Sequence, residues 1–89
     1  MSDNIVRIGK KPVMSYIVAT MTCLTEHNGH ARLLARGRAI NTLVDVVESL
    51  RHRYLPDIQV KIRIGTDEVP VEDGYRKVSM MEITLETEG

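Results

Sequence analysis

Apolar and polar residues alternate strictly from Ile58 to Ile64, and this period of two predicts a β-strand with one buried face. A second strand is predicted from Lys77 to Leu85. One face of that strand carries Ser79, Met81, Ile83 and Leu85. The segment between the two strands contains Pro70 and the turn pair Asp73-Gly74. We therefore expect a hairpin with a long, acidic and mobile loop near residues 66–76.

A period of 3.6 residues predicts two helices. The first begins with Pro12 at its first position, where a missing N–H costs nothing, and it ends at His27-Asn28-Gly29. The second runs from about Gly37 to Tyr54 and is stopped by Pro56. The apolar stripe of the first helix is Met14, Ile17, Val18, Met21 and Leu24. The stripe of the second is Ile40, Leu43, Val44, Val47 and Leu50.

Two shorter apolar runs, Ile5–Ile8 and Ala31–Ala35, precede the helices and fit short strands. The order strand-helix-strand-helix-strand-strand predicts an α/β fold, a two-layer α+β sandwich of two helices on a four-stranded mixed sheet, within one domain spanning residues 1–89. A strand joined to the next through one helix is normally parallel to it. Both strand–helix junctions are therefore expected at the carboxyl edge of the sheet.

These two junctions are basic. Gly9-Lys10-Lys11-Pro12 follows the first strand and Ala35-Arg36-Gly37-Arg38 follows the second. Four positive side chains are thus expected to meet beside two helix N-termini, where free N–H groups favour anions. The mononucleotide motifs Gly-x-x-x-x-Gly-Lys-Ser/Thr and Gly-x-Gly-x-x-Gly do not occur, and an array of separate charges fits a polyphosphate backbone better.

The formal net charge is zero, but its distribution is uneven. Residues 1–65 hold ten Lys or Arg and five acids, whereas residues 66–89 hold two bases and seven acids. This asymmetry suggests a basic working surface and an acidic C-terminal segment, although two solvated faces would give the same counts. A chain of 89 residues without Trp or Phe builds a modest aliphatic core, so oligomerisation is expected.

Composition and motif content argue against several other classes. A single cysteine, Cys23, excludes an intrachain disulfide and favours a reducing, cytoplasmic compartment, and no apolar run of 18 residues predicts a membrane span. Cys23 is expected to be a core thiol. His27 and His30 have no convincing third ligand, so no metal site and no cofactor is predicted. The acids near residues 66–76 lack the rigidity that acid–base catalysis needs, so an enzyme is not expected.

Three segments carry a family likeness: residues 8–16 (IGKKPVMSY), 35–40 (ARGRAI) and 51–56 (RHRYLP). In this order they resemble the archaeal Alba (Sac10b) chromatin proteins, over essentially the whole chain. The resemblance implies a βαβαββ fold and a homodimer that binds double-stranded DNA with little sequence preference, and RNA as well. It also implies cooperative coating and compaction of DNA in the nucleoid through dimer–dimer contacts, which would give filaments, or heterodimers with a paralogue.

The resemblance assigns roles to individual residues. Lys10 and Lys11 would be the central phosphate-binding lysines, one of them open to acetylation by a lysine acetylase and its deacetylase partner. Acetylation removes a charge and would weaken binding. Arg53, Tyr54 and Leu55 would form the dimer–dimer contact, with Tyr54 where Phe is usual. Arg36 and Arg38, from the second loop, would be the partners of the two lysines. Gly37, Asn41, Arg76 and Lys77 complete the candidate nucleic-acid-binding residues. Arg76 and Lys77 open the last strand, where an arm could grip a groove of the nucleic acid, and simple solvation explains these two equally well.

Two alternatives remain open at this point. One is a ribonucleoprotein subunit that scaffolds structured RNA, which competition between RNA and duplex DNA would reveal. The other is a protein-interaction paralogue with weakened DNA binding, which the neutral net charge and the acidic segment would favour. Such a protein would bind neither polymer at low salt.

Overall fold

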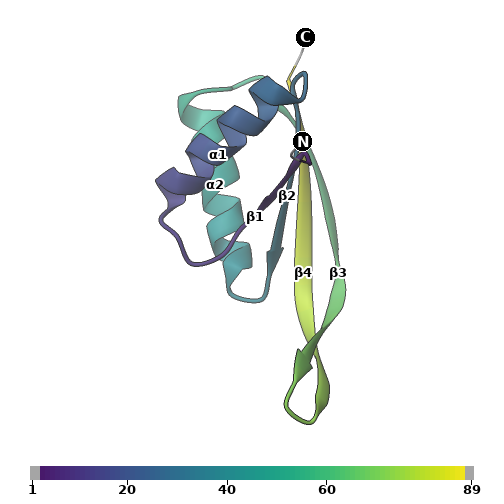
Figure 1. Ribbon diagram of the computed structural model, residues 1–89. Helices are drawn as coiled ribbons and strands as arrows, with labels where there is room; N and C mark the ends of the chain where they lie inside the picture. The colour runs from purple at the N-terminus through teal and green to yellow at the C-terminus, as the bar shows by residue number, and fades with distance from the viewer. Residues whose placement is uncertain (1–2, 88–89) are drawn as a thin grey trace.

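The computed structural model describes residues 3–87 and shows two helices packed on one face of a four-stranded sheet (Figure 1). The sheet order is β1-β2-β4-β3, with β1 parallel to β2 and with β4 antiparallel to both of its neighbours. The predicted order of elements, the two helices and the mixed sheet are confirmed. The elements are β1 (Ile5–Arg7), α1 (Val13–Glu26), β2 (His30–Arg36), α2 (Ala39–Arg53), β3 (Gln59–Val71) and β4 (Gly74–Glu86).

The core lies between the helices and the strands β1, β2 and β4. It is aliphatic, as the composition requires, and its most deeply buried side chains are Leu33, Leu43, Leu50, Leu85 and Val46. Cys23 is buried within this cluster, as expected. Burial is the main cause of the raised pKa of its thiol, followed by the nearby charges of Glu26 and Asp3. The thiol therefore stays protonated at neutral pH and serves as a packing group.

The helix starts differ slightly from the prediction. Pro12 caps α1 with extended backbone (ψ 153°), so the helix begins one residue later, at Val13. The second helix begins at Ala39 instead of Gly37, because Gly37 has a φ of 54°. Glycine adopts this left-handed conformation without steric cost, and it turns the chain sharply between β2 and α2.

The prediction of a long loop near residues 66–76 is wrong. These residues continue the antiparallel pairing of β3 and β4, and only a two-residue turn at Glu72-Asp73 joins the strands. Pro70 fits because β3 is an edge strand, where a missing N–H can face outwards. Glu68 lies opposite Lys77, and opposite charges in register favour the pairing. The hairpin consequently extends beyond the helices as a narrow arm (Figure 1).

The expectation that β3 buries one face is also wrong over part of its length. Ile58 is buried, but the side chains of Ile62 and Ile64 are 62% and 72% exposed. In the register they lie opposite Ile83 and Met81, which belong to the core or pack against it. The helices lie mainly over β1 and β2, and this part of β3 stays exposed. We call Ile62 and Ile64 the apolar strip.

Candidate functional site

The topology brings the two basic loops and the tip of the hairpin to one edge of the sheet. The β1–α1 loop and the β2–α2 loop follow parallel strands, so both lie at the carboxyl edge. β3 is antiparallel to β4, and β4 is antiparallel to β2, so the tip of the hairpin projects from the same edge (Figure 1). The molecule is 47 Å long because of this arm.

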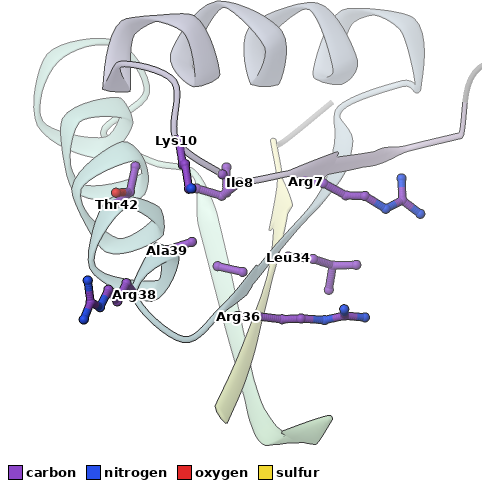
Figure 2. A pocket seen from close by; sticks show the side chains of 10 residues that line it. Arg7, Ile8, Lys10, Leu34, Arg36, Arg38, Ala39 and Thr42 are labelled. Atoms are coloured by element: carbon purple, nitrogen blue, oxygen red, sulfur yellow. The ribbon is translucent and has the colours of Figure 1, made fainter. Parts of the chain in front are cut away.

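An open groove of about 790 Å³ lies at this edge, between the two loops and the start of α2. Its floor is apolar, and its sides carry four cations, Arg7, Lys10, Arg36 and Arg38 (Figure 2). None of the described residues that line the groove carries a carboxyl group. A volume of this order exceeds what one small anion fills, and the separate charges along the groove suit the successive phosphates of a polymer. The remaining lining residues are Ile8, Gly9, Leu34, Ala35, Ala39 and Thr42.

The structure brings together three of the four predicted loop cations. Lys10, Arg36 and Arg38 line the groove, whereas Lys11 is exposed beside it. Arg7 was not predicted from the sequence, although its place as the last residue of β1 was a usable signal. A side chain at the carboxyl end of a parallel strand reaches the same edge as the loop that follows. Gly37 and Asn41 are exposed close by, and Thr42 lines the groove in place of Asn41.

The four cations occupy both sides of the sheet edge. Figure 2 shows Arg7 and Arg36 pointing away from the helices, while Lys10 and Arg38 lie on the side of α2. The strand register supports this placement of Arg7 and Arg36. Arg7 lies opposite Leu34 on the helix-free face, and Arg36, two residues further along β2, shares that face. The positive surface therefore wraps around the edge and does not form one closed pocket, which suits a chain of phosphates more than a single anion.

Tyr16 holds the β1–α1 loop in place. Its hydroxyl oxygen accepts hydrogen bonds from the backbone N–H groups of Gly9 and Lys11, at 2.8 and 2.9 Å. The ring is buried within the core cluster, so the loop is anchored to the body of the domain. Gly9 passes close to this hydroxyl, since a Cβ there would lie 3.4 Å from the oxygen. The backbone of Lys10, between the two bonded amides, is thereby held at the groove.

Both helix N-termini at this edge are open to an anion. Neither Pro12 nor Arg38 makes a side-chain capping hydrogen bond, and no acidic residue lies in the first turn of α1 or α2. The first N–H groups of a helix have no partners within it, and the helix dipole adds a partial positive charge there. Both effects reinforce the side-chain cations.

Two of the groove cations are already engaged in ion pairs. Arg36 donates from Nε to Asp67 Oδ2 of the hairpin at 2.9 Å. Arg7 Nη1 lies 3.9 Å from Asp3 Oδ2. Within residues 3–87, no carboxylate lies within 4.0 Å of the charged groups of Lys10 or Arg38. These two cations are thus free to bind an anion without breaking a contact.

The other predicted residues lie outside the groove. Arg76 and Lys77 are exposed on β4 in the outer half of the hairpin. Arg53 and Tyr54 are exposed at the end of α2, with Leu55 half-buried beside them.

In residues 3–87 no three His, Cys, Asp or Glu side chains cluster as metal ligands would, and no helix there is long and apolar enough to cross a membrane.

Comparison with known proteins identifies the family. Residues 4–66 match the Alba family model. The chain is 44% identical over 86 residues to the DNA/RNA-binding protein Alba 1 of Archaeoglobus fulgidus, covering 96% of this chain and 97% of that protein. It is 42% identical to the DNA/RNA-binding protein Alba of Methanocella arvoryzae, covering 93% and 88%. Both relatives are named as binding proteins and not as enzymes, in agreement with the expectation for this chain.

Solved structures agree with the sequence relatives. Alba from Thermoplasma volcanium superposes with a TM-score of 0.86 at 39% identity, covering 93% of this chain and 99% of that one. Alba1 from Trypanosoma brucei gives a TM-score of 0.73 at 27% identity, covering 98% of this chain and 71% of that one. The matched sequence, the shared topology and the basic edge lead to one conclusion: this chain belongs to the Alba family.

Proposed function

We propose that this protein is a dimeric, largely sequence-independent nucleic-acid-binding protein that coats and compacts double-stranded DNA and also binds RNA. The groove carries the proposal, because four cations line it on the two sides of the sheet edge and none of its described lining residues is acidic. The names of the curated relatives, DNA/RNA-binding proteins, support the same polymer class. Contacts to phosphates position a protein on nucleic acid without reading its sequence.

Each set of cations in the groove would bind different phosphates of the nucleic-acid backbone. Lys10 and Arg38 carry unpaired charges beside two uncapped helix N-termini, so they are the primary phosphate ligands. Arg7 and Arg36 would extend the contact to the helix-free face, and Arg76 and Lys77 would extend it along the arm. Acetylation of Lys10 or of the exposed Lys11 would remove one positive charge and weaken binding.

The apolar strip supports dimerisation. Ile62 and Ile64 are large apolar side chains exposed next to core residues of β4, and the helices of the same chain leave them uncovered. A second copy that covers this strip would continue the core across a two-fold interface. Exposed Val44 on α2 would add to it. Two grooves on one dimer would then engage the same polymer.

Coating also requires contact between dimers. Tyr54 is 45% exposed at the end of α2, between exposed Arg53 and half-buried Leu55. An aromatic ring flanked by Arg and Leu has the composition of a small protein contact. We assign these three residues to the dimer–dimer contact.

The double charge reversal Lys10→Glu with Arg38→Glu tests the proposal. We expect affinity for duplex DNA to fall at least about a hundredfold, because two phosphate contacts become repulsive. The matched control is Lys61→Glu with Arg51→Glu, which changes net charge equally at exposed positions outside the groove. Near-equal losses in both variants, with circular dichroism unchanged, would contradict a localised site. If structured RNA displaces duplex DNA in competition, the proposed function changes from coating DNA to scaffolding RNA.

A further inference from the structure

We infer that Asp67 is an internal competitor of phosphate: its carboxylate occupies the guanidinium of Arg36 and lowers the affinity of the groove. This inference rests on the proposed function. It assigns a role to an acidic residue that lies outside the groove. Asp67 is one of the seven acids of residues 66–89, and its contact with a groove cation shows how that acidic segment reaches the groove.

The contact is direct and joins two separate elements. Arg36 is the last residue of β2, and Asp67 lies on β3, with β4 between them. Arg36 Nε donates to Asp67 Oδ2 at 2.9 Å. The side chain of Arg36 is 61% exposed and that of Asp67 is 37% exposed, so both groups remain accessible to a ligand.

The register explains how Arg36 reaches across β4. Arg36 lies opposite Met80, and Met80 lies opposite Gly65, which has no side chain in that row. Asp67 stands two residues further along β3, on the same helix-free face. Met80 is only 8% exposed although the helices pack on the other face. An Arg36 stem that lies over Met80 accounts for this cover.

The carboxylate and a phosphate would use the same donors. A guanidinium binds both groups through charged N–H···O bonds, and Nε belongs to one of its bidentate edges. A phosphate that approaches this edge must displace Asp67, or it must bind beside a like charge. Lys10 and Arg38 have no such competitor among the described residues. Arg36 therefore contributes less than its charge suggests.

The same contact ties the arm to the groove. Besides the Arg36–Asp67 pair, Gly37 donates its N–H to the carbonyl of Ser79 on β4 at 2.8 Å. The β2–α2 loop and the hairpin are thus joined at two points. A phosphate that takes Arg36 releases one of them and leaves the backbone bond in place.

The test measures duplex DNA binding by Asp67→Asn, which keeps the side-chain shape and removes the charge. We expect the Kd to fall about fivefold per protomer, the upper value for an exposed ion pair. The slope of log K against log salt should steepen by about 0.9 for each further phosphate that the variant neutralises. Asp73→Asn is the matched control, because it makes the same substitution at the exposed turn of the hairpin, and no basic group lies within 4.0 Å of Asp73 among the described residues. We expect that variant to change the Kd less than twofold.

A double-mutant cycle makes the assignment specific to Arg36. In an Arg36→Gln background, Asp67→Asn should lose its effect, because Asp67 then has no guanidinium to withhold from phosphate. Equal increases in affinity from Asp67→Asn and Asp73→Asn would overturn the inference and indicate general repulsion by the arm. A loss of affinity in Asp67→Asn would overturn it too, since Asp67 would then be positioning Arg36. Failure of every variant and of the original protein to bind DNA or RNA at low salt would instead refute the proposed function.

Discussion

The two halves of the sheet show how the same alternating pattern can have different outcomes. In β2, alternate residues are buried under the helices, and Ala31 and Leu33 are fully inaccessible. In β3, the equally regular alternation leaves Ile62 and Ile64 exposed. The difference lies in what covers each strand, because both helices pack over the β1–β2 side. Periodicity therefore predicts which side chains share a face and leaves open whether the same chain covers that face.

The two halves also differ in what they present. The covered half, β1 and β2, leads into the two basic loops. The uncovered half, β3 with the outer hairpin, presents the apolar strip and the arm that carries Asp67, Arg76 and Lys77, and we propose that a second copy covers the strip. The edge at which both halves end holds the groove (Figures 1 and 2).

The largest expected effect concerns the apolar strip. The double substitution Ile62→Asp with Ile64→Asp would place charges in the proposed interface, where they would be buried without partners. We expect the dimer dissociation constant to rise at least about a thousandfold, measured by sedimentation. Met14→Asp with Val18→Asp is the control, because these apolar side chains are similarly exposed on α1. A dimer that survives the first pair, or that is lost equally in the control, would show that the uncovered half is not the interface.

The covered half should respond to a single truncation. Leu33→Ala removes a fully buried side chain, so we expect the free energy of unfolding to fall by about 3 kcal/mol or more. Ile64→Ala truncates a side chain that is exposed in the single chain. Its cost should depend on protein concentration and vanish on dilution below the dimer dissociation constant. Urea unfolding at several protein concentrations separates the two, and a concentration-independent loss in Ile64→Ala would contradict the assignment.

A smaller effect is expected at the anchored loop. Tyr16→Phe leaves the N–H groups of Gly9 and Lys11 without their acceptor, so Lys10 is held less firmly. We expect duplex affinity to fall about three- to tenfold, a size typical of one or two lost neutral hydrogen bonds. Tyr75→Phe makes the same chemical change at an exposed tyrosine on the arm and should leave affinity unaltered. Indistinguishable affinities in the two variants would show that Tyr16 does not position Lys10.

The smallest effect is a pH dependence of stability. Hydrogen bonds from Arg32 and then Arg63, together with their charges, hold the pKa of Glu82 below its usual value, and these contacts join β2, β4 and β3. A lowered pKa in the folded state stabilises the fold above the unfolded-state pKa, about 4.3 for Glu. That contribution is lost as pH falls through the folded-state pKa. Unfolding of the original protein and of Glu82→Gln should therefore differ at pH 7 and converge in acid. A difference that stays constant down to pH 2 would refute this linkage.

Much of the fold could be predicted from the sequence because its signals are local. The 3.6-residue stripes located both helices, and Gly37 and Pro56 bracketed α2 to within a few residues. The outer hairpin was missed because Pro70 and the acidic residues resemble a loop when they are considered singly. Their cross-strand partners, such as Lys77 opposite Glu68, become visible only in register.

The candidate site was predicted in outline and not in its contacts. Parallel strands followed by basic loops were enough to place Lys10, Arg36 and Arg38 at one edge. Arg7 was overlooked because it lies within a strand and not in a loop. The Arg36–Asp67 pair joins residues 31 positions apart, and no local pattern encodes such a contact.

The decisive measurement for the groove is the salt dependence of duplex DNA binding. If a dimer presents four groove cations per protomer to the polymer, at most about eight phosphates are neutralised, and about six while Asp67 occupies Arg36. The slope of log K against log salt should then lie between about −5 and −7 and be the same for unrelated duplex sequences. A slope near zero, or no binding at low salt, would contradict a phosphate-binding groove.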